Sequence, residues 1–229
     1  MSLIHSAVTL AIRGILQVVC RIDAEQLHRV PPSGPLIVVV NHINSLEVPI
    51  IYSQLHPRPL TAFVKAETWD KPLLGGLARL WDAIPLRRGE ADSDAFRVAF
   101  RALDEHRIVV VAPEGTRSGH GQLQRGLPGV VLLALRSGVP LLPMATYGAE
   151  DYAANLRRLR RSDFTIKVGE PFLLAPGDRR VDKHQRQRLA DAMMYRIADL
   201  LPPSQRGVYA NEPGELASLT VATSLTRSA

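Results

Sequence analysis

The chain alternates short apolar runs with longer segments in which apolar residues recur at helical spacing. Runs of this kind are typical of strands that are buried on both faces, as in parallel sheets. Strands are predicted at 36–40, 60–65, 83–86, 108–112, 139–146 and 164–168. Helices are predicted at 3–20, from the polar group 41–45 to about Leu55, and at 93–105, 128–136 and 182–201. The alternation indicates the α/β class, with a mostly parallel central sheet flanked by helices.

One strand carries a further signal. Pro140 and Pro143 fall in the predicted strand 139–146. Proline has no N–H to donate to a neighbouring strand, so this strand is predicted to lie near an edge of the sheet.

The N-terminal helix has an unusually wide apolar surface, which leaves two interpretations open. It packs on the core, or it lies in a membrane interface, and the two do not exclude each other. Arg13 interrupts the stretch, and no run of 18 uncharged apolar residues occurs, so a transmembrane helix is not predicted. No basic residue precedes the stretch and no cleavage site follows it, which argues against a secretory signal.

The organisation along the chain follows from these patterns. Residues 1–29 are expected to form an N-terminal helical segment for membrane association, and 30–202 the main domain. Residues 203–229 are rich in small and polar residues without periodicity, so they are expected to be a poorly ordered tail.

Composition narrows the classes of partner. The 229 residues include one cysteine, Cys20, so an internal disulfide and a cysteine zinc site are excluded, and a reducing cytosol is the default. A net charge of +6, from 24 Arg and 4 Lys against 22 acidic residues, suits nucleic acid, an anionic membrane or a phosphorylated small molecule. Aromatic residues are only 5%, and no nucleic-acid motif accompanies the charge, so nucleic acid is disfavoured.

Polar residues repeatedly follow the buried strands. Asn41-His42, Lys65, Arg87-Arg88 and the segment 113–118 all stand at strand ends. In open α/β sheets, ligands bind beyond the carboxyl ends of the strands. The sequence therefore predicts a site at this edge of the sheet. There is no Walker loop, GxGxxG or nucleophile elbow, and no convincing metal cluster, so neither a metal nor a cofactor is expected.

His42 and Glu47 are the first candidates for chemistry. Five residues on one helix would leave them on different faces, but a loop position for His42 and a first-turn position for Glu47 let them approach. Histidine suits general-base work, and a carboxylate on its other nitrogen would fix the tautomer. Glu47 also stands three residues after Asn44, the spacing of a capping box, so capping remains an equal alternative.

The segment Pro113-Glu114-Gly115-Thr116-Arg117-Ser118 is the second candidate. Arg117 could hold a phosphate through its fork of donors, and backbone N–H groups beside Gly115 could form an anion nest. A polar surface turn is the alternative. Lys65 and Arg88, taken singly, fit surface charges as well as ligands.

Together these segments resemble the glycerolipid acyltransferase family, in particular its 1-acylglycerol-3-phosphate acyltransferases. The resemblance covers roughly residues 30–172 and rests on four motifs in order: Asn41-His42 with Glu47, Ile84 to Arg88, Pro113 to Ser118, and Val139 to Pro143. Lys65 and Arg125-Gly126 also stand where the family has basic positions. Two positions depart from the family pattern: Glu47 replaces the usual Asp, and Arg87 replaces a frequent Asp.

The resemblance implies acyl transfer from acyl-CoA or acyl-carrier protein to the hydroxyl of a lysophospholipid, without a cofactor. It implies His42 as general base and Glu47 as its partner. The substrate-binding residues would be Lys65, Arg88, Glu114, Gly115, Thr116, Arg117 and Arg125. The expected place is the cytoplasmic face of a membrane, with peripheral or monotopic attachment to anionic lipid. An acyltransferase for another lysolipid or aminolipid, and a silent lipid-binding relative, remain alternatives.

Overall fold

The computed structural model describes residues 3–87, 89, 92–177, 181–211 and 213–225. Its helices are α1 (Leu3–Val19), α2 (Glu47–Leu55), α3 (Pro72–Leu80), α4 (Ser93–Asp104), α5 (Gly129–Ser137), α6 (Tyr152–Arg157), α7 (Lys183–Ala198) and α8 (Gly214–Ala217). Its strands are β1 (Cys20–Asp23), β2 (Leu36–Val40), β3 (Leu60–Lys65), β4 (Ile84–Leu86), β5 (Ile108–Val111), β6 (Leu141–Tyr147), β7 (Ser162–Val168), β8 (Phe172–Leu174) and β9 (Thr220–Ala222).

The strands form one mostly parallel sheet in the order β1-β7-β6-β2-β5-β3-β4, and β8 and β9 extend it beside β6. The central strands β6, β2, β5, β3 and β4 are parallel, so their carboxyl ends share one edge. Strand β7 is antiparallel to β6. The predicted α/β class with a mostly parallel sheet flanked by helices is therefore confirmed.

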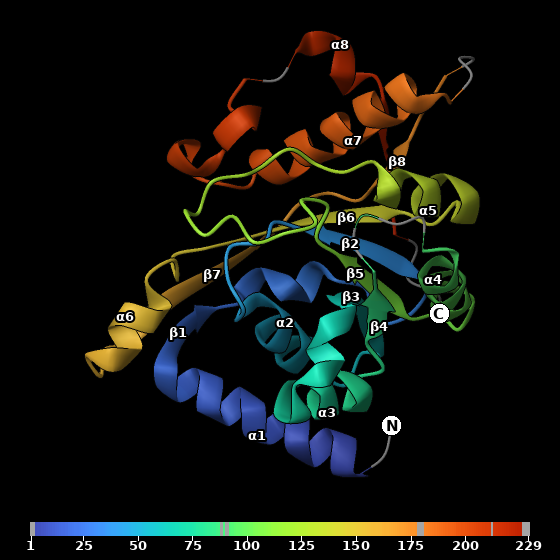
Figure 1. The fold of residues 1–229 in the computed structure, drawn as a ribbon. Helices are drawn as coiled ribbons and strands as arrows, with labels where there is room; N and C mark the ends of the chain where they lie inside the picture. Colours follow the sequence, from blue (N-terminus) through green and yellow to red (C-terminus); the bar gives the residue numbers. More distant parts are fainter. Residues whose placement is uncertain (1–2, 88, 90–91, 178–180, 212, 226–229) are drawn as a thin grey trace.

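Alternation along the strands creates a core on each face of the sheet. Ile37 and Val39 of β2 face a core that α4, α5 and α7 complete. Leu36, Val38 and Val40 face the opposite core, which α1 and α2 cover. Figure 1 shows the resulting three layers, with α1 to α3 on one side of the sheet and α5 and α7 on the other. Both faces of β2 are buried, which explains its uninterrupted apolar run.

The edge position predicted for β6 is wrong. This strand pairs with β2 on one side and with β7 and β8 on the other. The carbonyl of Pro143 accepts a hydrogen bond from Gly169 N, which lies between the end of β7 and the start of β8. The missing N–H of Pro143 thus faces the break between two partner strands, where no ladder bond has to be made.

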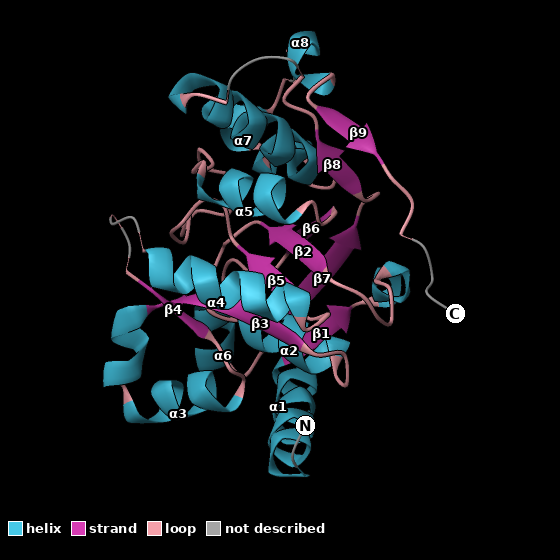
Figure 2. Ribbon diagram, turned by 90° about the vertical axis from the view of Figure 1, so that its right-hand side faces the viewer, coloured by secondary structure: helices cyan, strands magenta, loops and turns pink. Residues whose placement is uncertain are grey.

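The poorly ordered tail predicted for 203–229 is also wrong for the described part of that segment. Strand β9 pairs with β8 (Figure 2), and Leu216 and Leu219 are buried in the same core as residues of α7. Short 3-10 helices at Pro203–Gln205 and Gly207–Tyr209 carry the chain to that position. The segment has no periodicity because it is a chain of brief elements, each anchored by one or two apolar residues.

The boundary predicted at residue 29 does not separate two structural units. Strand β1 pairs with β7, and Leu16 of α1 and Cys20 are buried in the α1–α2 core. Thr9 accepts a hydrogen bond from the indole of Trp81. Within the described residues, no helix has both the length and the apolar character needed to cross a membrane.

Tyr209 links the C-terminal segment to the loop that follows β5. Its buried hydroxyl accepts from Gly126 N at 2.9 Å and donates to the Asp191 carboxylate at 2.8 Å. Tyr209→Phe leaves the Gly126 donor without its partner, so we expect a loss of about 1–3 kcal/mol in the free energy of unfolding, measured by denaturant titration.

The matched control is Tyr147→Phe, because the Tyr147 hydroxyl makes no hydrogen bond to another described residue. Equal effects of the two substitutions would contradict the role given to the Tyr209 hydroxyl.

Candidate active site

The site lies at the carboxyl edge of the sheet, where β2 and β5 end side by side. Continuing the pairing of Val39 with Val111 by three residues sets His42 opposite Glu114. The loop after β2 and the loop after β5 therefore meet. Buried, tightly paired strands fix where both loops begin, so the site is built on rigid elements.

Asn41 anchors the first loop. Its side-chain amide donates to the carbonyl of Thr146 at 2.8 Å, and its carbonyl oxygen accepts from Thr146 N at 2.7 Å. This pair of bonds continues the β2–β6 pairing by means of a side chain. The backbone is thereby free to turn immediately before His42.

The second loop holds both backbone groups of His42. His42 N donates to Glu114 Oε1 at 2.7 Å, and the carbonyl of His42 accepts from Ser118 N at 2.8 Å. The other oxygen of Glu114 accepts from Gln124 N at 2.9 Å. One carboxylate thus ties the His42 loop to the segment that follows the 113–118 loop.

Glu114 faces the interior. Its side chain is 5% exposed, and both of its oxygens accept backbone hydrogen bonds. Burial raises the pKa of its carboxyl above the ordinary value, and the two N–H donors act in the opposite direction. The position predicted for Glu114, in contact with a substrate, does not match this burial. The geometry instead favours support of the His42 backbone.

Glu47 lies at the first position of α2 and is 2% exposed. Its Oε2 is 2.6 Å from His42 Nδ1, and its Oε1 accepts from the backbone N–H groups of Ile43 and Asn44, each at 2.6 Å. The two interpretations of Glu47 are therefore not alternatives. One carboxylate oxygen fixes the turn before the helix, and the other contacts the imidazole.

The predicted capping box is only partly present. Helix α2 begins at Glu47, and Asn44 lies in the preceding turn, where its side-chain oxygen accepts from Leu46 N. Its amide also donates to the carbonyl of Ala149.

An ionised carboxylate only accepts hydrogen bonds, so the proton of the His42–Glu47 contact belongs to Nδ1. In the neutral ring, Nε2 of His42 then has the free lone pair. The His42 side chain is 18% exposed, and it is therefore accessible to a small reacting group. This is the arrangement of a general base with an orienting acid.

Gly115 begins the exposed part of the 113–118 loop. Its φ of +69° is a conformation that glycine adopts at little cost. A Cβ at this position would stand 2.6 Å from Cδ1 of the exposed Leu127, whose side chain would have to move. Thr116 and Arg117 are exposed, and their backbone N–H groups have no acceptor among the described residues.

The predicted basic residues lie along the same edge at increasing distance from His42. Arg117 and Arg125 are exposed in the segment after β5. Lys65 ends β3, two strands from β2, which is about 10 Å at the usual strand spacing, and it pairs with Glu67 at 3.1 Å. Arg88 lies outside the described residues. Its neighbour Arg87 follows β4 one strand further away and stands 3.6 Å from Asp92.

Several supporting residues have little signal in the sequence. Asn41 belongs to an obvious polar cluster, but its pairing with Thr146 depends on strand order. Gln187 and Tyr209 hold the backbone of Gly126 from α7 and from the C-terminal segment. Contacts between parts of the chain so far apart cannot be read from local patterns. Among the described residues, no group of three or more His, Cys, Asp or Glu side chains could hold a metal ion.

The sequence profile of the acyltransferase family matches residues 21–147, which contain the His42–Glu47 pair and the 113–118 loop. The chain belongs to the acyltransferase family. The resemblance inferred from the four motifs is therefore confirmed.

Individual members of the family are similar over part of their length. The human 1-acyl-sn-glycerol-3-phosphate acyltransferase alpha is 29% identical over 154 residues, which is 66% of this chain and 54% of that protein. The 1-acyl-sn-glycerol-3-phosphate acyltransferase of Limnanthes alba is 31% identical over 140 residues, 59% of this chain and 50% of that protein. The chain spans about half the length of the curated relatives it matches.

A solved acyltransferase has a similar fold. The crystal structure of the 1-acyl-sn-glycerophosphate (LPA) acyltransferase PlsC from Thermotoga maritima superposes with a TM-score of 0.61 at 20% identity. The match covers 86% of this chain and 81% of that chain. This likeness concerns the arrangement of sheet and helices.

The double role of Glu47 can be separated by substitution. In Glu47→Gln, one side-chain oxygen can still accept from Ile43 and Asn44, but the amide cannot stabilise an imidazolium by charge. We expect the variant to fold normally and to transfer acyl groups at least about tenfold more slowly, which is about 1.4 kcal/mol of barrier.

Glu47→Asp is the companion variant and should keep substantial activity, since it restores a charged partner with a shorter reach. Thermal unfolding and turnover are measured on both. Full activity of Glu47→Gln would show that the carboxylate serves the turn alone.

Proposed function

We propose that this protein transfers a fatty acyl group from a thioester donor to the free hydroxyl of 1-acylglycerol-3-phosphate and so forms phosphatidic acid. The observation that carries the proposal is the contact of His42 Nδ1 with Glu47 at the sheet edge where the basic residues stand. The names of the relatives supply the acceptor class, and membership of the family supplies the reaction type.

The proposed reaction begins at His42 Nε2, which takes the proton of the acceptor hydroxyl. The oxygen attacks the carbonyl carbon of the thioester, and a tetrahedral intermediate forms. Its collapse breaks the C–S bond, and the imidazolium returns the proton to the leaving sulfur as a free thiol. Glu47 stabilises the imidazolium between these two transfers. No acyl-enzyme and no cofactor is needed.

Two groups of hydrogen-bond donors are proposed to stabilise the negative charges of the reaction. The free N–H groups of Thr116 and Arg117 stand in a turn opened by Gly115, which is the geometry of an anion nest. Arg117 and Arg125 offer exposed guanidinium groups for the acceptor phosphate, with Lys65 further along the edge. Arg88 is proposed for the same phosphate from the resemblance alone.

The proposal extends to the membrane. All outward-facing residues of α1 are uncharged, and the large ones are strongly exposed, such as Leu3 at 91% and Val18 at 72%. An exposed helix face without a charge or a protein partner suits the interface of a bilayer. The protein would then be peripheral or monotopic, on the cytoplasmic face where thioester donors occur.

One assay tests the reaction. Purified protein is given an acyl-CoA or acyl-carrier protein and a panel of lysolipids, and free thiol release is followed. We expect release with 1-acylglycerol-3-phosphate and a loss of at least about 10²-fold in folded His42→Ala, because general-base catalysis contributes about that much or more.

Preference for a lysolipid without a phosphomonoester would move the acceptor to another class. Lipid binding without turnover would indicate a silent relative. Near-normal turnover of His42→Ala would refute the assigned base.

The membrane contact has its own test. Ile15→Glu with Val18→Glu places two charges on the exposed face of α1, where no buried contact is lost. We expect vesicle binding, measured by co-sedimentation, to weaken at least about tenfold, because each apolar side chain gains about 1.5–3 kcal/mol on leaving water.

Val98→Glu with Val221→Glu is the matched control, since both valines are exposed on other elements, α4 and β9. Equal binding of the two double variants would place the membrane contact elsewhere.

A further inference from the structure

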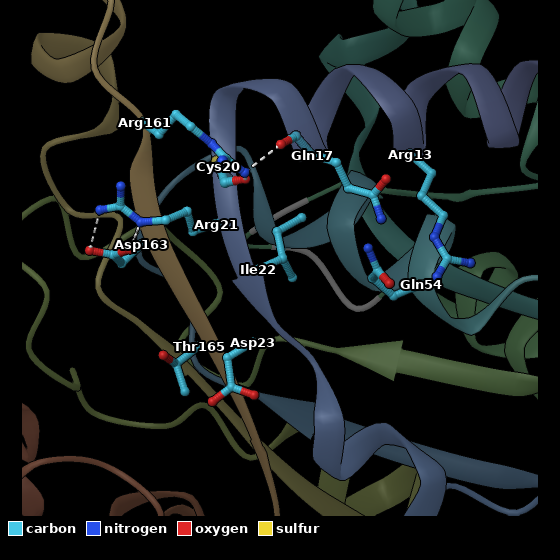
Figure 3. Close-up of a pocket in the computed structure, with 10 residues that line it drawn as sticks. All are labelled: Arg13, Gln17, Cys20, Arg21, Ile22, Asp23, Gln54, Arg161, Asp163 and Thr165. Atoms are coloured by element: carbon cyan, nitrogen blue, oxygen red, sulfur yellow. Dashed lines mark hydrogen bonds and ion pairs between the residues drawn. The ribbon is translucent and has the colours of Figure 1, made fainter.

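A cleft of about 790 Å³ opens between α1, β1, α2 and β7 (Figure 3). It lies at the same sheet edge as His42 but on the opposite side of β2. Strand β1 is three strands from β2, about 14 Å at the usual spacing, whereas Lys65, Arg117 and Arg125 belong to the β5 and β3 side. The cleft is therefore separate from the proposed acceptor site.

The carboxylates that line the cleft are neutralised by neighbours. Asp163 receives two hydrogen bonds from Arg21, at 2.6 and 3.0 Å, and the pKa of its carboxyl is lowered by that bond. Asp23 stands 3.7 Å from the ammonium of Lys167. Neither carboxylate opposes the binding of an anion with its full charge.

Two further guanidinium groups in the cleft keep their charge. Arg13 makes no hydrogen bond or ion pair with another described residue. Arg161 donates only to the carbonyls of Gln17 and Cys20, both at 2.7 Å, at the end of α1. The cleft therefore has a surplus of positive charge, and the bonds to α1 fix the position of Arg161.

Neutral donors complete the lining. The side-chain amides of Gln17 and Gln54 have no partner among the described residues, and Figure 3 shows both near the end of the Arg13 side chain. Cys20 and Ile22 supply an apolar floor. Unused amide and guanidinium donors beside an apolar wall match a phosphate group that is attached to glycerol and a hydrocarbon chain.

The position of Arg13 and Gln17 on α1 indicates that the phosphate belongs to a membrane lipid. Arg13 and Gln17 lie on the flank of the helix, between the buried face around Leu16 and the exposed apolar face. If that apolar face lies in the bilayer, this flank is at the level of the lipid head groups.

We infer that the cleft binds the phosphate head group of an anionic phospholipid, at a site distinct from the His42 site and the proposed acceptor site. The inference rests on the membrane contact of the proposed function. A lipid held here would fix the orientation of α1 and β1 on the bilayer, with the His42 edge beside the surface that supplies the acceptor.

The test uses the full chain and vesicles of phosphatidylcholine with or without phosphatidylglycerol. Phosphatidylglycerol is neither substrate nor product of the proposed reaction, so its effect does not report on the catalytic site. Arg13→Gln should weaken binding to the anionic vesicles at least about tenfold, because charge-assisted hydrogen bonds to phosphate are lost. Binding to phosphatidylcholine alone should stay as in the parent.

Lysine variants distinguish a specific phosphate contact from general attraction between positive residues and the anionic membrane. Arg13→Lys keeps the charge but not the fork, so it should remain at least about fivefold weaker than the parent. Arg158, exposed in the basic turn after α6 and outside the cleft, is the control, and Arg158→Lys should bind as the parent does. Parent-like binding by Arg13→Lys would overturn the inference, since charge alone would then explain the effect.

Free phosphate is the other source to exclude. Inorganic phosphate should displace the protein from the anionic vesicles no better than sulfate at equal ionic strength. Arg13-dependent binding of inorganic phosphate without vesicles would overturn the assignment to a lipid.

Thiol release from a soluble acceptor should be equal in Arg13→Gln and the parent. If neither protein shows release while the Arg13 effect on vesicles is present, the proposed reaction has failed and the lipid site stands.

Discussion

The carboxylate of Glu47 is the contact on which the site depends. It sits almost fully buried at the start of α2, and it accepts hydrogen bonds from one imidazole and two backbone N–H groups. A buried charge is tolerated only when its oxygens are satisfied, so the turn must close around it. The same condition that makes the turn stable directs His42 Nδ1 toward the carboxylate and leaves Nε2 for chemistry.

The remaining structure keeps this turn in place. Asn41 joins it to β6, and Glu114 and Ser118 hold the backbone of His42 from the loop after β5. Gln124 and Gly126 extend the support to α7 and Tyr209. The exposed residues of the site, such as Arg117, therefore project from a frame whose own polar groups are nearly all bonded inward.

The sequence alone predicts the strands of the sheet better than the long-range contacts that hold the site in place. The runs at β2 and β5 are apolar throughout because both sides of the sheet are covered there, and that pattern is local. Pro143 misleads because its effect depends on which neighbour faces its nitrogen. Glu114 sits in a motif associated with substrate, yet its burial follows from the β2–β5 register, which no local pattern contains. The C-terminal segment holds Tyr209 and Leu216 singly, without periodicity, so its packing could not be foreseen.

The state of the His42 ring tests the central claim most directly. Nitrogen-15 NMR of the labelled protein near neutral pH distinguishes a proton on Nδ1 from one on Nε2. For the neutral ring, the contact with Glu47 predicts the proton on Nδ1, and a loss of that preference in Glu47→Gln. A proton on Nε2 in the parent protein, or the same ring state in both proteins, would contradict the account of His42 as a base oriented by Glu47.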